Sequence, residues 1–344
     1  MAPARRIWKP SPGQPGINPN LLELYKNSMT SEPAFFIGDV PIFGDVMHAP
    51  MDGYTDSPFR TIAREYGSAI TYSEFMNAND LLTNPIINRL KLIFSEKERP
   101  IAFQVYDEDA ERIIQACLFL VQFQPDFLDI NMGCSTQTVS GRGAGAGLLK
   151  EPQKIARIFN QLKKACPLPI TAKIRLGWDN SVKNYLEVAK IIEDNGGSMI
   201  AVHARTRHQG MTGRVELHAI TEIKKQAKIP IIGNGDILTV EDIKATKLKT
   251  GCDAVMIGRG SIGNPWLLSK REIAKVPKSE VLDVITRHLE MMVGIYGDIR
   301  GVIRFRKHLK RYLMQTLDLS LGEVKTFMNL KQKDEIILYL NKYY

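Results

Sequence analysis

Eight short apolar or β-branched runs alternate with longer helical patterns, and this alternation restricts the fold more than any other feature. The runs begin 23 to 43 residues apart, a spacing that accommodates one strand and one helix each. They occupy residues 46–49, 69–72, 101–105, 127–130, 170–174, 199–203, 229–232 and 254–257. Their near-continuous apolar character is typical of parallel strands covered on both faces. The sequence therefore predicts an α/β fold, a (β/α)8 TIM barrel, with a doubly wound open sheet as the alternative.

The chain divides into three parts by pattern. Residues 1–37 begin with a segment rich in proline, asparagine and serine, which indicates an irregular extension. Residues 38–270 contain the eight strand candidates and form the predicted barrel domain. In residues 271–344 the strand pattern is absent, and apolar residues recur at helical spacing from Val281 to Leu313. We expect a small helical domain there.

Two helix starts can be predicted from polar residues. Asp107 precedes an apolar helical pattern that contains Ile113, and acidic residues follow it directly. Thr239 is followed by Asp242 at the spacing of a capping box. We therefore expect helices to begin at these two positions.

Positive charge is concentrated near the C-terminus. The formal net charge is +9, and residues 271–344 carry 14 Lys and Arg against 9 Asp and Glu, so 14 − 9 = +5 lies in that segment. Arg304, Lys307 and Arg311 share one helical face. Such a stripe is either a solvated helix surface or an interface for a polyanion.

Several classes of protein are disfavoured by what the chain lacks. We find no apolar run long enough for a membrane span and no secretion signal at the N-terminus. The four cysteines contain no C-x-x-C pair, so they predict neither a disulfide framework nor a zinc site, and we expect no metal. A cytoplasmic protein without a membrane partner is the expectation, with a monomer as the default.

Polar side chains follow the strand candidates at one end. In a parallel barrel the carboxyl ends of the strands meet at one mouth, where chemistry collects. Most of the eight runs end in or near Gln, Asn, Lys, His or Arg, including Gln104, Asn131, Lys173, His203 and Asn234. One such residue alone could simply cap a strand, but the whole set predicts an active site at this mouth.

The last two strands predict a phosphate site. Gly233-Asn234-Gly235-Asp236 and Gly258-Arg259-Gly260 follow them, at the corner where barrels commonly bind phosphate. Glycine lets backbone N–H groups approach an anion, and Arg259 adds a charged donor. Lys173, a buried cation, requires a carbonyl or anionic partner. A phosphorylated, planar, carbonyl-rich cofactor suits this combination; flavin mononucleotide (FMN) fits, although other phosphorylated ligands use the same corner.

Cys134 has the most distinctive position of the four thiols. It follows the fourth strand and opens a loop that contains four glycines between residues 135 and 147. The position favours a catalytic role, and the glycines favour a mobile lid. The other three cysteines are expected to be packing residues.

Six motifs occur in order at barrel spacing: APMDGYTDSPFR (49–60), DINMGC (129–134), AKIRLGW (172–178), VHARTR (202–207), IGNGDI (232–237) and MIGRGSIGNPW (256–266). Together they resemble the dihydrouridine synthases, flavoenzymes that reduce the C5–C6 double bond of particular tRNA uridines. The resemblance extends from about residue 38 to residue 315. It implies a TIM barrel that binds FMN, a nicotinamide reductant (NADPH or NADH), and a helical domain that grips tRNA.

The resemblance also implies roles for individual residues. Cys134 matches the catalytic cysteine, which gives a proton to C5 after hydride transfer from the flavin to C6. Asn131 and Arg205 match positions that face the target base, and Arg304, Lys307 and Arg311 would contact the RNA. Cofactor contacts are implied for Pro50, Met51, Asp52, Gln104, Lys173, His203, Asn234, Gly235, Asp236, Gly258 and Arg259.

The chain departs from the family pattern at its two ends, where the N-terminal extension and the compact tail are atypical, and at two places within the barrel. Ser135-Thr136-Gln137 replaces the usual proline and nearby lysine after the cysteine, and Asp52 replaces a small apolar residue. Two alternatives to a tRNA-directed enzyme are an FMN-dependent dehydrogenase or reductase of a free pyrimidine and an RNA-binding protein with a vestigial flavin site. The basic tail argues against the first, and the presence of Cys134, Lys173 and Arg259 argues against the second.

Overall fold

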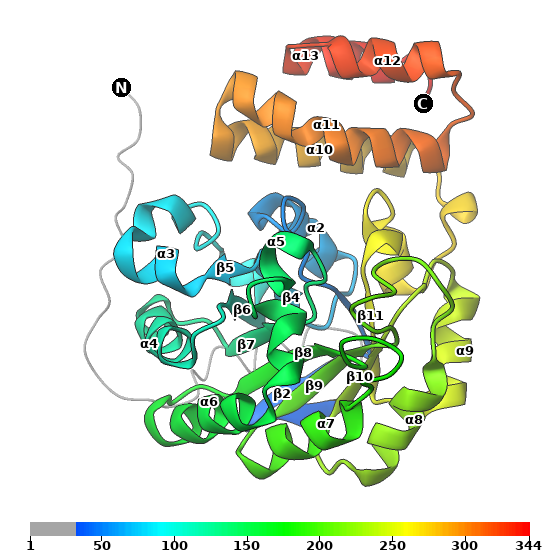
Figure 1. Ribbon diagram of the computed structural model, residues 1–344. Coiled ribbons are helices and arrows are strands. Elements are labelled where there is room, and N and C mark those ends of the chain that lie inside the picture. The colour runs from blue at the N-terminus through cyan, green and yellow to red at the C-terminus, as the bar shows by residue number, and fades with distance from the viewer. Residues whose placement is uncertain (1–31) are drawn as a thin grey trace.

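The computed structural model describes residues 32–344, and its centre is a parallel sheet curled into a barrel (Figure 1). Along the sheet the strand order is β3, β11, β10, β9, β8, β7, β6 and β4. These strands are β3 (Val46–His48), β4 (Thr71–Tyr72), β6 (Ile101–Tyr106), β7 (Phe127–Met132), β8 (Ile170–Arg175), β9 (Met199–His203), β10 (Ile231–Asn234) and β11 (Ala254–Ile257). All eight predicted strands are present.

The barrel is closed by hydrogen bonds between β3 and the segment that leads into β4. The backbone N–H of Ala69 donates to the carbonyl oxygen of Val46 at 2.8 Å. The backbone N–H of Tyr72 donates to Nε2 of the buried His48 at 3.1 Å. A short strand β5 (Met76–Asn77) extends this edge by pairing with the end of β6. The (β/α)8 barrel is therefore confirmed, and the open-sheet alternative is wrong.

Helices between the strands cover the outside of the barrel. They are α2 (Ser57–Glu65), α3 (Ala78–Thr83), α4 (Ala110–Leu120), α6 (Pro152–Ala165), α7 (Tyr185–Asp194), α8 (Leu217–Gln226) and α9 (Val240–Thr250). Thr239 and Asp242 form the predicted capping box. The helix expected from Asp107 is capped instead by Asp109, whose side chain accepts from the N–H of Arg112. The side chain of Asp107 instead forms an ion pair with the guanidinium of Arg112, so the helix is capped two residues later than predicted.

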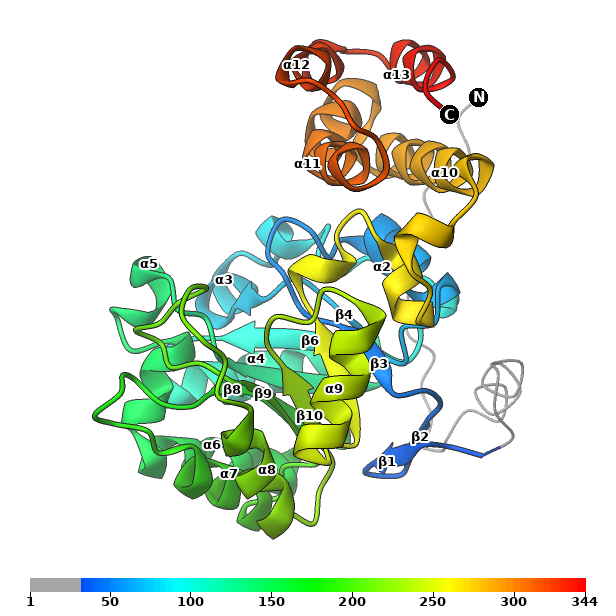
Figure 2. The same cartoon turned by 90° about the vertical axis from the view of Figure 1, so that its right-hand side faces the viewer.

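A hairpin of β1 (Phe35–Ile37) and β2 (Val40–Ile42) precedes the barrel. Ile37 and Ile42 are fully buried and pack with Phe127 at the start of β7, so the hairpin covers the amino-terminal end of the strands (Figure 2). Regular structure thus begins before residue 38, where we expected the barrel domain to start. The rest of the predicted extension, up to residue 31, lies outside the described residues.

Four helices form a layer at the opposite end of the barrel (Figures 1 and 2). They are α10 (Lys278–Tyr296), α11 (Asp298–Thr316), α12 (Leu321–Asn329) and α13 (Lys333–Leu340). Their buried faces share a separate core with Trp266. Helix α11 approaches the loop after β11 closely, since a Cβ on Gly263 would lie 2.6 Å from the backbone of Arg311. The predicted helical segment is thus an ordered layer next to the carboxyl ends of the strands. None of the helices described here is both long and apolar enough to cross a membrane.

Candidate active site

A cavity of about 440 Å³ opens at the carboxyl end of the strands. Strand register explains why distant residues meet there. Asn131 is paired with Lys173 on the next strand, and His203 with Asn234, so their side chains enter the barrel at similar heights. The lining includes all of the residues expected at the cofactor, together with Asn131, Cys134 and Arg311: Pro50, Met51, Asp52, Gln104, Lys173, His203, Asn234, Gly235, Asp236, Gly258 and Arg259.

Lys173 reaches across the cavity from β8. Its Nζ donates to Oδ1 of Asn234 at 3.0 Å, and the Nδ2 of Asn234 donates to the carbonyl oxygen of Met256. Burial and the neighbouring Arg175 lower the pKa of Lys173 to about 8, which Asp129 partly opposes. Lys173 is therefore a cation at neutral pH, held near its titration point by its low-dielectric surroundings.

A chain of hydrogen bonds leads from the barrel interior to Cys134. The hydroxyl of Thr171 donates to the buried carboxylate of Asp129. Nε2 of Gln104 donates to the same carboxylate, at 2.6 Å from its Oδ2. The amide nitrogen of Asn131 donates to Oε1 of Gln104, and the oxygen of Asn131 accepts from the backbone N–H of Cys134. Because a carboxylate accepts only, Asp129 sets the orientation of both amides and thereby the position of the Cys134 backbone. Burial raises the pKa of Asp129 to about 6, so it is ionised at neutral pH.

The thiol of Cys134 lies at the wall of the cavity. Its Sγ is 3.3 Å from Oγ1 of Thr136, one of the residues that departs from the family pattern. Lys173 and Arg175 both interact with it electrostatically. The arrangement leaves a partly exposed sulfur beside two cations.

The glycine-containing segment after Cys134 is not a free lid. It forms α5 (Gln137–Ser140) and the 3-10 helix η4 (Gly145–Lys150), in which five of six residues are buried. Its Ala146 N–H donates to the carbonyl oxygen of Cys134. The glycines allow close packing instead: a Cβ on Gly145 would lie 3.0 Å from Cβ of Cys134.

The corner after β10 and β11 combines a tight backbone with paired charges. Gly235 has φ +138°, a conformation that favours glycine. The carboxylate of Asp236 accepts from Arg205 at 2.9 Å and from Arg259 at 3.1 Å. The pKa of Asp236 is lowered from its usual value, mainly by the hydrogen bonds that Arg205 donates to its carboxylate. Arg205 is thus buried behind this corner, whereas Arg259 is half-exposed at the cavity.

Comparison with known proteins gives the family. The family model described as "Dihydrouridine synthase (Dus)" matches residues 47–335. The chain belongs to the dihydrouridine synthase family. It is 37% identical to tRNA-dihydrouridine synthase B of Pasteurella multocida over 285 residues, covering 80% of this chain and 86% of that protein. It is 39% identical to a probable tRNA-dihydrouridine synthase of Aquifex aeolicus over 260 residues, covering 72% and 80%. The resemblance inferred from the six motifs is confirmed.

A solved structure supports the fold assignment. Histamine dehydrogenase from Rhizobium sp. 4-9 superposes with a TM-score of 0.54 at 13% identity, covering 88% of this chain and 52% of that chain. At this identity the likeness concerns the fold alone.

The residues present in this member of the dihydrouridine synthase family fit a flavin. The cavity has the volume of a small-molecule site. Lys173 offers a cation at its floor and Arg259 a donor beside two glycines at its corner. Burial and the surrounding cations Lys173, Arg175, Arg205 and Arg259 lower the pKa of His203, which therefore stays neutral beside the ligand space.

Four predicted site residues have other principal contacts. Asp52 forms an ion pair with Lys91 at 2.7 Å. Arg205 does not line the cavity, because its guanidinium donates to Asp236 and to the carbonyl oxygen of Gly213. Lys307 lies half-buried above the ring of Tyr54, at 5.0 Å from its centroid, and Arg304 stacks on Tyr296 at the surface. Of the basic stripe on α11, only Arg311 reaches the cavity lining.

Arg175 is a site residue that our sequence predictions omitted. Its Nε donates to the carbonyl oxygen of Gly133 at 2.7 Å, and Nη1 donates to those of Thr206 and Gly210. It thereby ties the Cys134 loop to the loop after β9. The signal was available, because Arg175 stands two residues after Lys173 and alternate residues of a strand face the same side.

Proposed function

We propose that this chain reduces the C5–C6 double bond of specific tRNA uridines to dihydrouridine, with FMN in the cavity and Cys134 as the general acid. NADPH or NADH is the proposed reductant of the flavin. The observation that carries the proposal is the meeting of Cys134, Lys173 and the Arg259 corner in one cavity of a dihydrouridine synthase barrel. When bound and reduced, the flavin supplies the hydride that adds to C6 of the base.

The chain's own residues prepare the cofactor space. Lys173 would hold a polar edge of the flavin ring and stabilise negative charge on it. The glycine corner and Arg259 would hold the phosphate, while Asp236 aligns Arg259 and neutralises Arg205. Because the carboxylate of Asp236 repels a phosphate, its contribution is to orient these arginines.

Cys134 completes the reduction. A uridine must leave its stack to enter the barrel mouth, as bases do in other base-modifying enzymes. Hydride addition at C6 leaves an electron pair at C5, and the thiol of Cys134 gives its proton to that carbon. The side-chain oxygen of Asn131 already accepts from the N–H groups of Gly133 and Cys134, which favours a positioning role over direct base contact.

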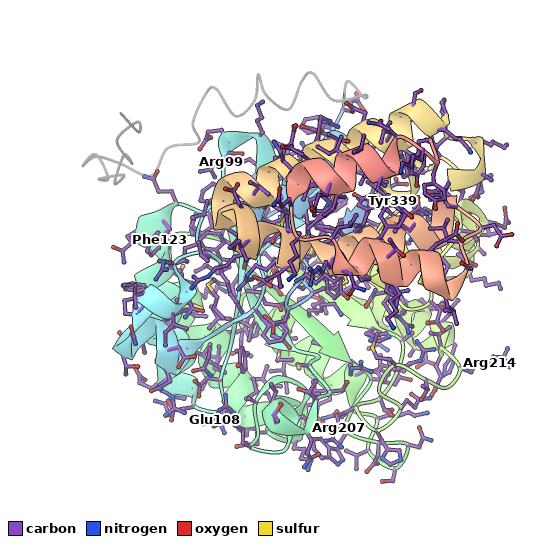
Figure 3. All side chains as sticks on the ribbon, turned by 90° about the horizontal axis from the view of Figure 1, so that it is seen from above. Arg99, Glu108, Phe123, Arg207, Arg214 and Tyr339 are labelled. Carbon is purple, nitrogen blue, oxygen red and sulfur yellow. The ribbon has the colours of Figure 1, made fainter. Side chains whose placement is uncertain are left out.

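Helix α11 supplies a basic surface beside the mouth. Arg304 and Lys310 are exposed, and Arg311 extends from the same helix to the cavity. Seen from above in Figure 3, the helical layer covers one part of the barrel, and Arg207 lies beyond its edge. An RNA that enters the cavity would therefore pass α11, where arginines can contact its phosphates.

Flavin reoxidation separates this function from its alternative. The purified flavoprotein is reduced with NADPH without oxygen, and unmodified tRNA, uridine or uracil is then added. Rapid reoxidation by tRNA, with dihydrouridine detected in the RNA, is the expected result. Reoxidation by the free compounds with tRNA inert would instead identify a reductase of free pyrimidines, and no reoxidation by any of them would overturn the proposal.

A further inference from the structure

Three ionisable side chains that do not line the active-site cavity meet between the barrel and the helical layer, next to the cavity residue Tyr54. Asp56 precedes α2, His288 lies on α10 and His308 on α11. One polar atom from each lies within 4.8 Å of the others. Asp56 is 3% exposed and both histidines are fully buried. The chain therefore brings a carboxylate and two imidazoles together at the junction of its two domains.

Most of the imidazole nitrogens in this cluster have no protein partner. Nδ1 of His288 is 3.2 Å from the hydroxyl of Tyr312, whereas Nε2 of His288 has no hydrogen bond. Neither nitrogen of His308 has one. The rings of Tyr54 and Phe59 lie 5.3 and 5.8 Å from His308 between centroids, so its surroundings are largely aromatic. Buried polar atoms without partners are rare in folded proteins and indicate something further at the site.

We propose that Asp56, His288 and His308 bind a zinc ion that fastens the helical layer to the barrel. Two imidazole nitrogens and one carboxylate oxygen are donors that zinc accepts, with a water left for the fourth position. Tetrahedral zinc with bonds of about 2.0–2.1 Å needs its ligand atoms roughly 3.3 Å apart. Side-chain movements on the order of 1 Å would close the present cluster to that size.

Neighbouring groups already orient these ligands. The hydroxyl of Tyr296 donates to Oδ2 of Asp56 at 3.0 Å, and the N–H of Phe59 donates to Oδ1 at 3.3 Å. Tyr312 contacts the nitrogen of His288 that a metal would not use. Such outer contacts are typical of metal ligands, whose orientation they fix.

The charges around the cluster permit a cation. Glu74 interacts electrostatically with Asp56 and adds a second negative charge. Lys307 places a positive charge near the cluster, and its ammonium group lies over the ring of Tyr54. Arg60 is neutralised by its buried ion pair with Glu98. Both imidazoles are fully buried, and the rings of Tyr54 and Phe59 lie beside His308.

The consequence of the site is mechanical. Its ligands come from α10, α11 and the segment before α2, so the ion would join the two domains at one point. Helix α11 also carries Arg311 to the active-site cavity. A metal at this junction would therefore hold the basic surface in place without contacting the flavin space.

The test is the zinc content of the purified flavoprotein, measured by elemental mass spectrometry after incubation with zinc sulfate and gel filtration. We expect about one zinc per chain, and a melting temperature that zinc raises and EDTA lowers. Asp56→Asn keeps the shape and the helix cap, since asparagine is an equally good N-cap. It should still fold and retain flavin but lose zinc affinity at least tenfold, as should His308→Gln.

Two control variants make the result specific. Asp283→Asn removes an exposed carboxylate on α10, and Cys134→Ala removes the thiol in the cavity that could bind zinc independently. Both should retain one zinc per chain. Zinc below about 0.1 per chain in the wild type, indicating that water alone fills the cluster, would overturn the proposal. So would equal zinc in the wild type and Asp56→Asn, or the absence of zinc from Cys134→Ala. Because flavin reoxidation by tRNA is measured separately, failure here leaves the proposed reaction untouched.

Discussion

The side-chain oxygen of Asn131 accepts a hydrogen bond from the backbone N–H of Cys134 at 2.9 Å. Since Asn131 is fixed through Gln104 to the buried Asp129, the Cys134 backbone is positioned from the barrel interior as well as by its own loop, whose Ala146 N–H donates to the Cys134 carbonyl oxygen. The register of β6 and β7, which places Gln104 opposite Asp129, thereby determines where the cysteine backbone lies. It also explains how a loop that departs from the family pattern at Ser135, Thr136 and Gln137 can present the cysteine at the cavity.

Replacing Cys134 with alanine tests its role as the acid. General acid catalysis contributes about 10² to 10⁴ in rate, so Cys134→Ala should reduce dihydrouridine formation by that factor. Flavin content should stay unchanged, because the flavin is expected to rest on Lys173 and the glycine corner. Single-turnover reoxidation by tRNA measures the rate, and flavin absorbance measures the content. Cys166→Ala, which alters a cysteine outside the cavity lining, is the matched control; a fully active Cys134→Ala protein would contradict the assignment.

Flavin affinity should fall as the pH rises above about 8. Lys173 has a pKa lowered to about 8, and an anionic or carbonyl partner favours its protonated form. Below pH 8 the cation is already present, whereas above it a proton must be taken up on binding, which weakens affinity by up to about tenfold per pH unit. Titration of the deflavinated protein with FMN from pH 6.5 to 9.5 measures this dependence. Lys173→Met should bind FMN weakly with no break near pH 8, and an unchanged break there would assign the titration to another group.

The exposed arginines of α11 should govern the salt dependence of tRNA binding. Arg304 and Arg311 are accessible, whereas Lys307 is half-buried against Tyr54. Replacing both arginines with glutamine should lower the slope of log K against log salt by about 0.7 to 0.9 for each phosphate that the variant no longer binds, and raise the KM for tRNA. NADPH-dependent flavin reduction should not change. The same double replacement at Lys163 and Lys164, on the outer helix α6, should leave the slope unchanged.

The buried pair of Arg60 and Glu98 should be important for stability. Both side chains are fully buried, and Nε of Arg60 lies 2.7 Å from Oε2 of Glu98. Arg60 also donates to the carbonyl oxygens of Thr55 and Ile93. Arg60→Met would leave the Glu98 carboxylate uncompensated, at a cost of about 3–5 kcal/mol in the free energy of unfolding. Urea unfolding measures it. Combining Arg60→Met with Glu98→Gln should recover part of the loss, and a double variant less stable than the single one would refute this explanation.

Much of the fold follows from the sequence by itself. Alternating apolar runs and helical patterns determine eight parallel strands, and parallel topology requires their carboxyl ends to meet. For that reason Gln104, Lys173, His203 and Asn234 could be assigned to one cavity before any distance was known. Local chemistry likewise determined the helix that begins after Thr239, because a capping box involves only neighbouring residues.

Other features were decided by tertiary structure alone. The sequence marks Arg205 as polar at a strand end, but only the fold shows that Asp236 takes up its charge. The glycines after Cys134 suggested a lid, yet packing uses them for close approach of the backbone. Asp56 and His308 lie 252 positions apart and meet only because α11 docks on the loop before α2. Periodicity records which side of an element is buried, whereas the partner of a buried group depends on long-range packing that no local pattern encodes.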